Sequence, residues 1–184
     1  MGWFNRIVLL TLIFLGLGFF PRGAWGTGLT SGNPAPNFLV ESGDNQPLSL
    51  DMLRGKVIVL FYESRNVIRK NIELKNELKR LYREQPASIR KDIFRLVVID
   101  CSEAFLVTTP IWKSKLQEHS RKEGFTIYGD WDKKMFADYH MQPEESNFLI
   151  IDKRGIIRYA AVSKVENGQF EKIKGILFSL VREG

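Results

Sequence analysis

The sequence predicts an α/β three-layer sandwich, in which helices cover both faces of a mixed central sheet. Two apolar, β-branched runs at residues 57–62 and 93–99 have the composition of strands buried on both faces, and a helical segment separates them. A third apolar run, 148–151, is followed by a turn and a further strand. Strands joined through a helix lie parallel, whereas the strands of a hairpin lie antiparallel, so the sheet is predicted to be mixed.

The composition excludes several classes of protein. The chain has 184 residues, of which 44% are hydrophobic and 26% are charged, and this balance excludes a disordered chain, a collagen and a multi-pass membrane protein. A single cysteine excludes a disulfide framework, a thiolate zinc site and a self-contained CxxC redox pair. The net charge of +6 is spread along the chain, without a basic stripe or a phosphate-binding glycine loop, which argues against nucleic-acid binding.

Residues 1–26 have the layout of a secretory signal peptide. Arg6 supplies a positive n-region, residues 7–20 form an uncharged apolar run, and Ala24 and Gly26 are the small residues before a cleavage site. The alternative is an uncleaved anchor, but 14 residues rise only ~21 Å as a helix, against about 30 Å of hydrocarbon. We therefore expect cleavage after Gly26, a periplasmic or secreted protein, and no stable membrane insertion after cleavage.

The first half of the mature chain is predicted to contain a linker, a turn, a strand and a long helix. Residues 27–33 form a Gly/Ser/Thr linker, and the domain occupies 34–184. Residues 42–46 read as a turn, and 48–53 as a short helical turn before the 57–62 strand. The spacing of apolar residues predicts a helix over 67–85. Asn71 falls on the apolar face of that helix, where a polar group needs a hydrogen-bond partner.

The second half alternates strands and helices before ending in a hairpin and a helix. After the 93–99 strand, Thr109 and Pro110 begin a helix that extends to about residue 121. A short strand over 125–128 precedes a helix capped by Asp130 and extending to about residue 139. Residues 152–155 form the turn between the strands at 148–151 and 156–161, and 167–182 form an amphipathic helix.

Three segments resemble the redoxin branch of the thioredoxin-fold proteins. They are GxxAPNF at 32–38, LRGKVIVLFY at 53–62 and FLIIDKRGII at 148–157. The whole is most similar to the YtfJ-like family of exported thioredoxin-fold proteins, over about residues 32–181. Arg65, Lys70-Asn71 and Glu144-Glu145-Ser146 are further points of similarity. The resemblance implies a thioredoxin-like sandwich.

The redox residues of such proteins are missing from this sequence. Redoxins with thiol-disulfide activity place a CxxC where the first strand enters the helix, and residues 65–68 here are Arg-Asn-Val-Ile. The proline that usually precedes the closing hairpin is replaced by Ser146-Asn147. Disulfide exchange needs an attacking and a resolving thiol, so the sequence predicts that this activity is absent.

A polar edge is the first candidate site, because ligands of α/β sheets collect where parallel strands end. The arginines near the predicted helix start would meet the helix dipole unfavourably unless an anion or a carboxylate compensates. Two interpretations stay open: a site for a small anion or a peptide, or an ion pair between Arg65 and Glu144 or Glu145. The candidate residues of this edge are Ser64, Arg65, Asn66, Arg69, Glu144, Glu145 and Ser146.

Cys101 is the alternative site. It follows the second strand, where a thiol is expected to be accessible, but Asp100 and Glu103 would raise its pKa and reduce its reactivity. The competing interpretation is a small, half-buried residue of apolar character. A third possibility, a metal held by Asp130, Asp132 and a histidine, lacks ligand spacing, because His119 and His140 lie on different segments. We expect no metal and no cofactor.

The sequence therefore predicts an exported binding or accessory module of the cell envelope. Its partner would be a protein, a peptide or a small anionic ligand bound at the polar edge. The alternative function is a single-cysteine thiol or peroxide oxidoreductase that uses Cys101.

Overall fold

The computed structural model describes residues 30–183. The predicted signal peptide over 1–26 and its cleavage site lie outside these residues. Within residues 30–183, no helix combines the length and the apolar character that crossing a membrane requires. The last residues before the domain, 30–33, lie against its final strand, because Gly32 N donates to Ile157 O at 2.8 Å and Ile157 N donates to Asn33 O at 2.9 Å.

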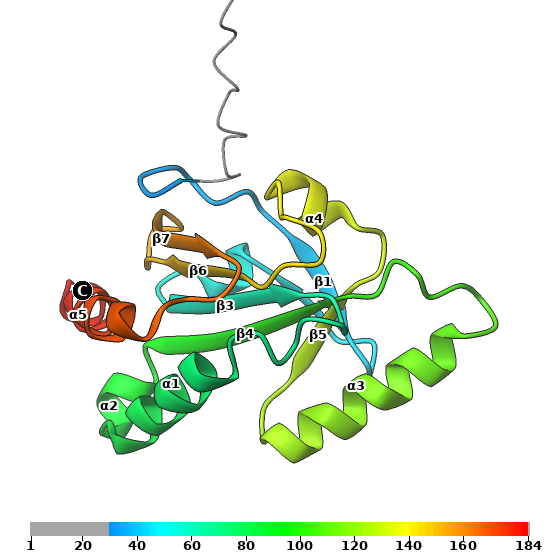
Figure 1. Ribbon diagram of the computed structural model, residues 1–184, viewed down its shortest axis with the longest axis horizontal. Coiled ribbons are helices and arrows are strands. Elements are labelled where there is room, and N and C mark those ends of the chain that lie inside the picture. Colours follow the sequence, from blue (N-terminus) through cyan, green and yellow to red (C-terminus); the bar gives the residue numbers. More distant parts are fainter. Residues whose placement is uncertain (1–29, 184) are drawn as a thin grey trace, which may run out of the picture.

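A seven-stranded mixed sheet forms the centre of the domain (Figure 1). Its order is β2-β1-β5-β4-β3-β6-β7; β3, β4 and β5 are parallel, and every other neighbouring pair is antiparallel. This arrangement confirms the predicted parallel pair and the closing hairpin. The strands are β1 Leu39–Ser42, β2 Pro47–Ser49, β3 Val57–Glu63, β4 Ile93–Asp100, β5 Ile127–Asp130, β6 Asn147–Ile151 and β7 Ile157–Val162.

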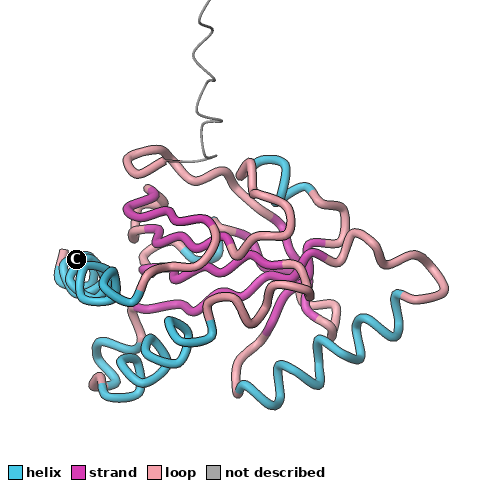
Figure 2. Tube along the Cα trace, viewed as in Figure 1, coloured by secondary structure: helices cyan, strands magenta, loops and turns pink. Residues whose placement is uncertain are grey.

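Helices cover both faces of this sheet, as Figures 1 and 2 show. One face carries α1, α3 and α5, and the other carries α4 and the segment that leads into β1. The fold is thus the predicted three-layer sandwich. The helices are α1 Ile72–Glu84, α2 Ala87–Arg90, α3 Thr109–Glu123, α4 Lys134–Asp138 and α5 Phe170–Arg182, with short 3₁₀ turns η1 Asp51–Leu53 and η2 Asn167–Gln169.

Strand β3 is buried along its whole length and supplies side chains to both layers of the core. Val59 and Phe61 pack toward α1 and α5, whereas Leu60 and Tyr62 pack toward α4 and the N-terminal segment. This alternation follows from the two-residue period of a strand. A continuous apolar run was therefore the correct signal for a strand with helices on each side.

The structure differs from the sequence prediction in several elements before β4, and the short helix α2 is one that was not predicted. The helix expected over 67–85 begins only at Ile72, and residues 65–71 form turns. The helical turn expected over 48–53 is divided between β2 and η1, and β1 was not predicted. Strands β1 and β2 are short, and β1 pairs not only with β2 but also with the distant β5, so tertiary contacts help to determine them.

Candidate functional site

Three chain segments meet at the edge where β3 and β4 end. Glu63 is the last residue of β3 and lies opposite Ile99 of β4, while Asn147, the first residue of β6, lies opposite Tyr62. This register brings the 64–71 turns close to the 144–146 loop. The sequence predicted that these two segments would share an edge.

A buried polar network holds this edge together. The Glu63 side chain is fully buried and accepts hydrogen bonds from Ser146 Oγ, at 2.6 Å, and from Lys75 Nζ. Asn71 Nδ2 donates to Ser146 Oγ at 2.9 Å and to Ser163 O at 2.8 Å, and Asn71 Oδ1 accepts from Val165 N at 2.8 Å. Burial raises the pKa of Glu63, and the contacts with Lys75 and Ser146 oppose that rise. Ser146 and Asn71 therefore join β3, β6 and the segment after β7.

Arg65 does not form the ion pair that was one interpretation of the sequence. Within residues 30–183, its guanidinium has no carboxylate partner and lies 5.3 Å from the ring centroid of Trp112. Lys70 pairs with Glu145 instead, and Asn66 Nδ2 donates to Glu144 Oε2 at 3.3 Å. The reason is the late start of α1, which leaves Arg65 on a turn directed toward α3.

The other arginine of the edge, Arg69, and the hydroxyl of Ser64 differ in their surroundings. Arg69 is exposed, with no ion pair among the described residues. Ser64 Oγ is buried and has no hydrogen-bond partner among residues 30–183. The edge therefore presents two exposed guanidinium groups, at Arg65 and Arg69, around a buried hydroxyl.

Cys101 is not accessible, contrary to the expectation from its place at a strand end. Its side chain is fully buried with Ile99, Leu116 and Ile127 beneath α3. Burial raises the pKa of the thiol to about 12, and the charges of Asp100 and Asp130 add to that rise. A thiol in this environment is almost entirely protonated at neutral pH, so it is a poor nucleophile.

Asp130 lies on the opposite face of the sheet from Cys101. Its Oδ2 accepts hydrogen bonds from Tyr62 OH at 3.0 Å and from Phe136 N at 2.9 Å, while its Oδ1 has no partner among the described residues. Burial raises its pKa, and the bond from Phe136 opposes that rise. Asp130 is therefore not the N-cap that the sequence predicted, because it ends β5 and α4 begins only after Lys133; its carboxylate still accepts from one free N–H of the first turn of α4. No group of three or more His, Cys, Asp and Glu side chains suited to a metal ion occurs between residues 30 and 183.

An exposed apolar loop beside the edge was missed by sequence reasoning. Phe105, Leu106 and Val107 are 65%, 94% and 80% exposed, and Ile111, in the first turn of α3, is 56% exposed. The loop is fixed to α3 because Thr108 N and Thr109 N both donate to Phe105 O. Its signal in the sequence was an apolar triplet between polar residues that matched neither helix nor strand periodicity.

Comparison with known proteins shows the family of this chain. Residues 31–160 match the AhpC/TSA family. The chain belongs to this family. A search of curated proteins found no match.

Solved structures with the same fold include redox proteins from several bacteria. A candidate protein disulfide isomerase from Bacteroides thetaiotaomicron is similar, with a TM-score of 0.64 and 17% identity. The match covers 86% of this AhpC/TSA chain and 95% of the isomerase chain. A thiol peroxidase from Chromobacterium violaceum has a TM-score of 0.59 and 11% identity, covering 83% and 88%. The exposed lipoprotein thioredoxin Etrx1 from Streptococcus pneumoniae has a TM-score of 0.56 and 15% identity, covering 79% and 100%. These similarities confirm the thioredoxin-like fold expected from the redoxin segments.

Proposed function

We propose that this AhpC/TSA chain is an exported, YtfJ-like protein that binds a partner at its polar edge and does not exchange disulfides. The partner would be a protein or peptide of the cell envelope with an acidic group, or a small anion. The observation that carries the proposal is the absence of an accessible thiol, and of the proline before the closing hairpin, from a chain that keeps the thioredoxin-like fold. Residues 65–68 are Arg-Asn-Val-Ile, and the only cysteine of the chain is buried.

The surface around the edge favours binding of a partner protein. Exposed apolar side chains that lie together mark interaction sites, and the 105–107 loop places three of them beside the first turn of α3. In that same turn, Trp112 supports the guanidinium of Arg65. An arginine held over an aromatic ring next to apolar side chains is typical of protein interfaces.

The buried network gives this surface a rigid base. Glu63, Ser146 and Asn71 are buried and bonded to one another, so they are not available to a ligand. They act instead by fixing the 64–71 turns against the 144–146 loop. Arg65, Asn66, Arg69, Glu144 and Glu145 remain as the residues that would contact the partner, with Ser146 and the buried hydroxyl of Ser64 beneath them.

Partner capture from the envelope fraction tests the proposal with matched exposed residues. We expect the wild-type mature chain to retain a specific protein, and Phe105→Ser and Arg65→Ala to retain it at least tenfold less. Met52→Ser is the matched control, because Met52 in η1 is also 65% exposed but belongs to another surface. Equal retention by all four proteins would contradict the role of the edge in protein binding.

The small-anion form of the proposal needs a second measurement. If the edge binds phosphate or sulfate through Arg65, these anions should raise the melting temperature of wild type above a matched chloride control, and not that of Arg65→Ala. If wild-type melting is the same in all three salts, the site does not take these anions. Sequencing of the native N-terminus should begin at or near Thr27, whereas recovery of the full-length chain in membranes would mean an anchored protein.

The single-cysteine oxidoreductase is the second proposal, because the family and the similarity to a thiol peroxidase favour it. A peroxide assay and an insulin-reduction assay distinguish the two proposals. We expect wild type to show no more turnover than Cys101→Ser in either assay. Turnover by wild type that Cys101→Ser loses would establish the oxidoreductase and overturn the binding-only function.

A further inference from the structure

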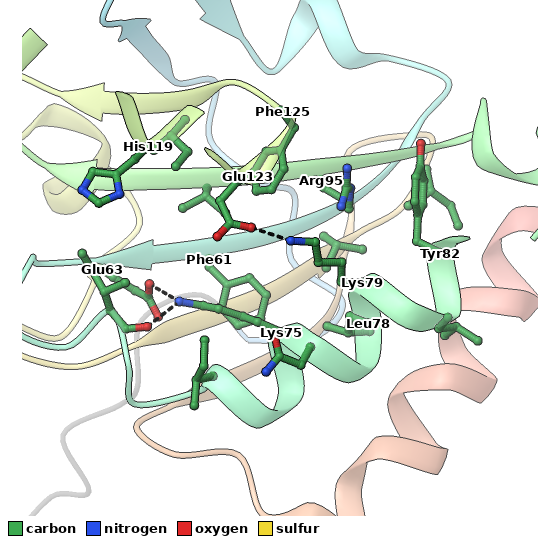
Figure 3. Close-up of a pocket in the computed structure, with 18 of the residues that line it drawn as sticks. Phe61, Glu63, Lys75, Leu78, Lys79, Tyr82, Arg95, His119, Glu123 and Phe125 are labelled. Carbon is green, nitrogen blue, oxygen red and sulfur yellow. Dashed lines mark hydrogen bonds and ion pairs between the residues drawn. The ribbon is translucent and has the colours of Figure 1, made fainter. Parts of the chain in front are cut away.

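A cleft separates α1 from α3 on the face of the sheet that these helices cover (Figure 3). Its volume is about 240 Å³, just below the ~300–1,000 Å³ of sites for drug-sized molecules. The floor is formed by β3, β4 and β5, and the walls by the two helices. Most of the lining is apolar, with contributions from Phe61, Leu78, Val97, Leu116, Phe125 and Ile127.

Two charged residues, Glu63 of β3 and Arg95 of β4, interrupt the apolar floor of this cleft. Arg95 lies on β4 opposite Val59 and shares its face of the sheet with Phe61 and Val97. Its guanidinium carbon is 4.4 Å from the ring centroid of Tyr82 and 4.6 Å from that of Phe125. Figure 3 shows Arg95 between these two rings. Stacking against a ring occupies the face of a guanidinium and leaves its N–H donors, which lie in the guanidinium plane, free for an acceptor.

Arg95 has no acid partner, whereas the lysines of the cleft do. Within residues 30–183, its side chain makes no hydrogen bond and no ion pair. Lys79 pairs with Glu123 at 2.8 Å, and Lys75 pairs with the buried Glu63. Glu123, whose carboxylate is paired with Lys79, attracts Arg95 electrostatically but does not bond to it. Among the described residues, Arg95 is therefore the cation of the cleft that has no bonded counter-ion, beside a mostly apolar lining. A half-buried, unpaired guanidinium is costly in such surroundings, and a carboxylate of a ligand would remove that cost.

We propose that the α1–α3 cleft binds a medium-chain alkanoate, with its carboxylate on Arg95 and its hydrocarbon chain along Phe61, Leu78 and Val97. A carboxylate matches the planar fork of a guanidinium, which can donate two parallel hydrogen bonds to it. The small volume favours one short chain over a phospholipid or a nucleotide. The cleft lies on the face covered by α1, α3 and α5, and Glu63 and Lys75 of the buried network line part of it. The partner-facing residues Arg65, Arg69 and Glu144 do not line it, so alkanoate binding and partner binding can be tested separately.

Calorimetric titration of the purified full chain with decanoate, below the micelle concentration of decanoate, tests whether the cleft binds an alkanoate. We expect saturable binding of one decanoate per chain, and at least tenfold weaker binding of decanol, which has the same chain length without the charge. Arg95→Gln should weaken decanoate binding by about 10- to 150-fold, the range expected for a hydrogen bond to a charged group. Val97→Phe, which fills the floor and keeps Arg95, should weaken decanoate and decanol together.

Arg121→Gln is the matched control, because it removes the same charge from an exposed position of α3 outside the cleft. Its affinity for decanoate should equal that of wild type, and thermal melting of every variant establishes that it is folded. The assignment is overturned if decanoate does not bind, or if decanol binds as tightly. It is also overturned if Arg121→Gln and Arg95→Gln lose affinity equally. Dimerisation that Val97→Phe abolishes would show instead that a second copy of the chain occupies the cleft.

Discussion

Asn71 is the residue whose replacement should most directly expose the energetics of the polar edge. Its side chain is 2% exposed and makes three hydrogen bonds, to Ser146 Oγ, Ser163 O and Val165 N. Asn71→Ala leaves the buried Val165 N–H and the half-buried Ser163 C=O without a partner, while the Ser146 hydroxyl keeps its bond to Glu63. An unsatisfied buried group costs about 1–3 kcal/mol and a half-buried one costs less, so the two together should cost roughly 3 kcal/mol of unfolding free energy.

Urea unfolding followed by circular dichroism measures this loss, and an unchanged m-value would show that the two-state comparison is valid. A domain of this size loses about 2–4 °C of melting temperature per kcal/mol, so the thermal midpoint should fall by roughly 6–12 °C. Asn66→Ala is the matched control, because Asn66 is exposed and makes a single 3.3 Å bond to Glu144. It should change stability by less than about 0.5 kcal/mol. A loss below about 1 kcal/mol for Asn71→Ala would refute the network as a stabilising element.

Three further predictions follow from buried or strained positions. Burial raises the pKa of Cys101 to about 12, so near pH 8 only about one thiol in 10⁴ is ionised. A disulfide reagent should therefore modify the native protein at least ~1,000-fold more slowly than the urea-unfolded chain. Equal rates would mean that the thiol is exposed. Burial raises the pKa of Asp130 in the folded state, so the folded chain holds this proton more tightly than the unfolded chain, and stability should fall as pH rises above the ordinary aspartate value of about 3.9. Other carboxyl groups, Glu63 among them, titrate in both proteins, so the contribution of Asp130 is the difference between the urea midpoints of wild type and Asp130→Asn. This difference should shift against wild type as pH rises, and parallel pH profiles would contradict it. Gly155, in the turn between β6 and β7, has φ +83°, so Gly155→Ala should cost about 1–2 kcal/mol of unfolding free energy, measured in urea. Gly168→Ala, at a position with open space for the added methyl group, should cost less. Equal losses would show that the backbone conformation of Gly155 is not the cause.

The buried strands could be predicted from sequence because their signal is local. The apolar runs at 57–62, 93–99 and 148–151 correspond to β3, β4 and β6, and their order determines which pair is parallel. The turn residues 152–155 likewise specify their hairpin, since Asp152 Oδ1 accepts from Arg154 N and Ile156 N. These elements are determined by burial and turn chemistry within a few residues of sequence.

The site was harder to predict because its contacts join distant segments. The sequence places Asn71 on an apolar face, but its partners at Ser146 and Val165 become neighbours only through the β3–β6–β7 register. The pairing of Lys70, rather than Arg65, with Glu145 depends on α1 beginning at Ile72. The burial of Cys101 depends on the packing of α3, which a position at a strand end does not specify.

The two flanks of the sheet have a consequence for how other chains can associate with this protein. At one flank, β2 has three residues and begins with Pro47, which has no N–H to donate to an added strand. At the other flank, the backbone of Gly32 and Asn33 is already hydrogen-bonded to the backbone of Ile157 in β7, and Ser31 Oγ donates to Arg158 O. Both flanks are thus shortened as templates for an added strand, because β2 is short and the beginning of β7 is covered, and this disfavours fibril-like strand addition. We therefore expect a peptide that binds this domain to be recognised mainly through its side chains, so its sequence should matter more than its ability to extend.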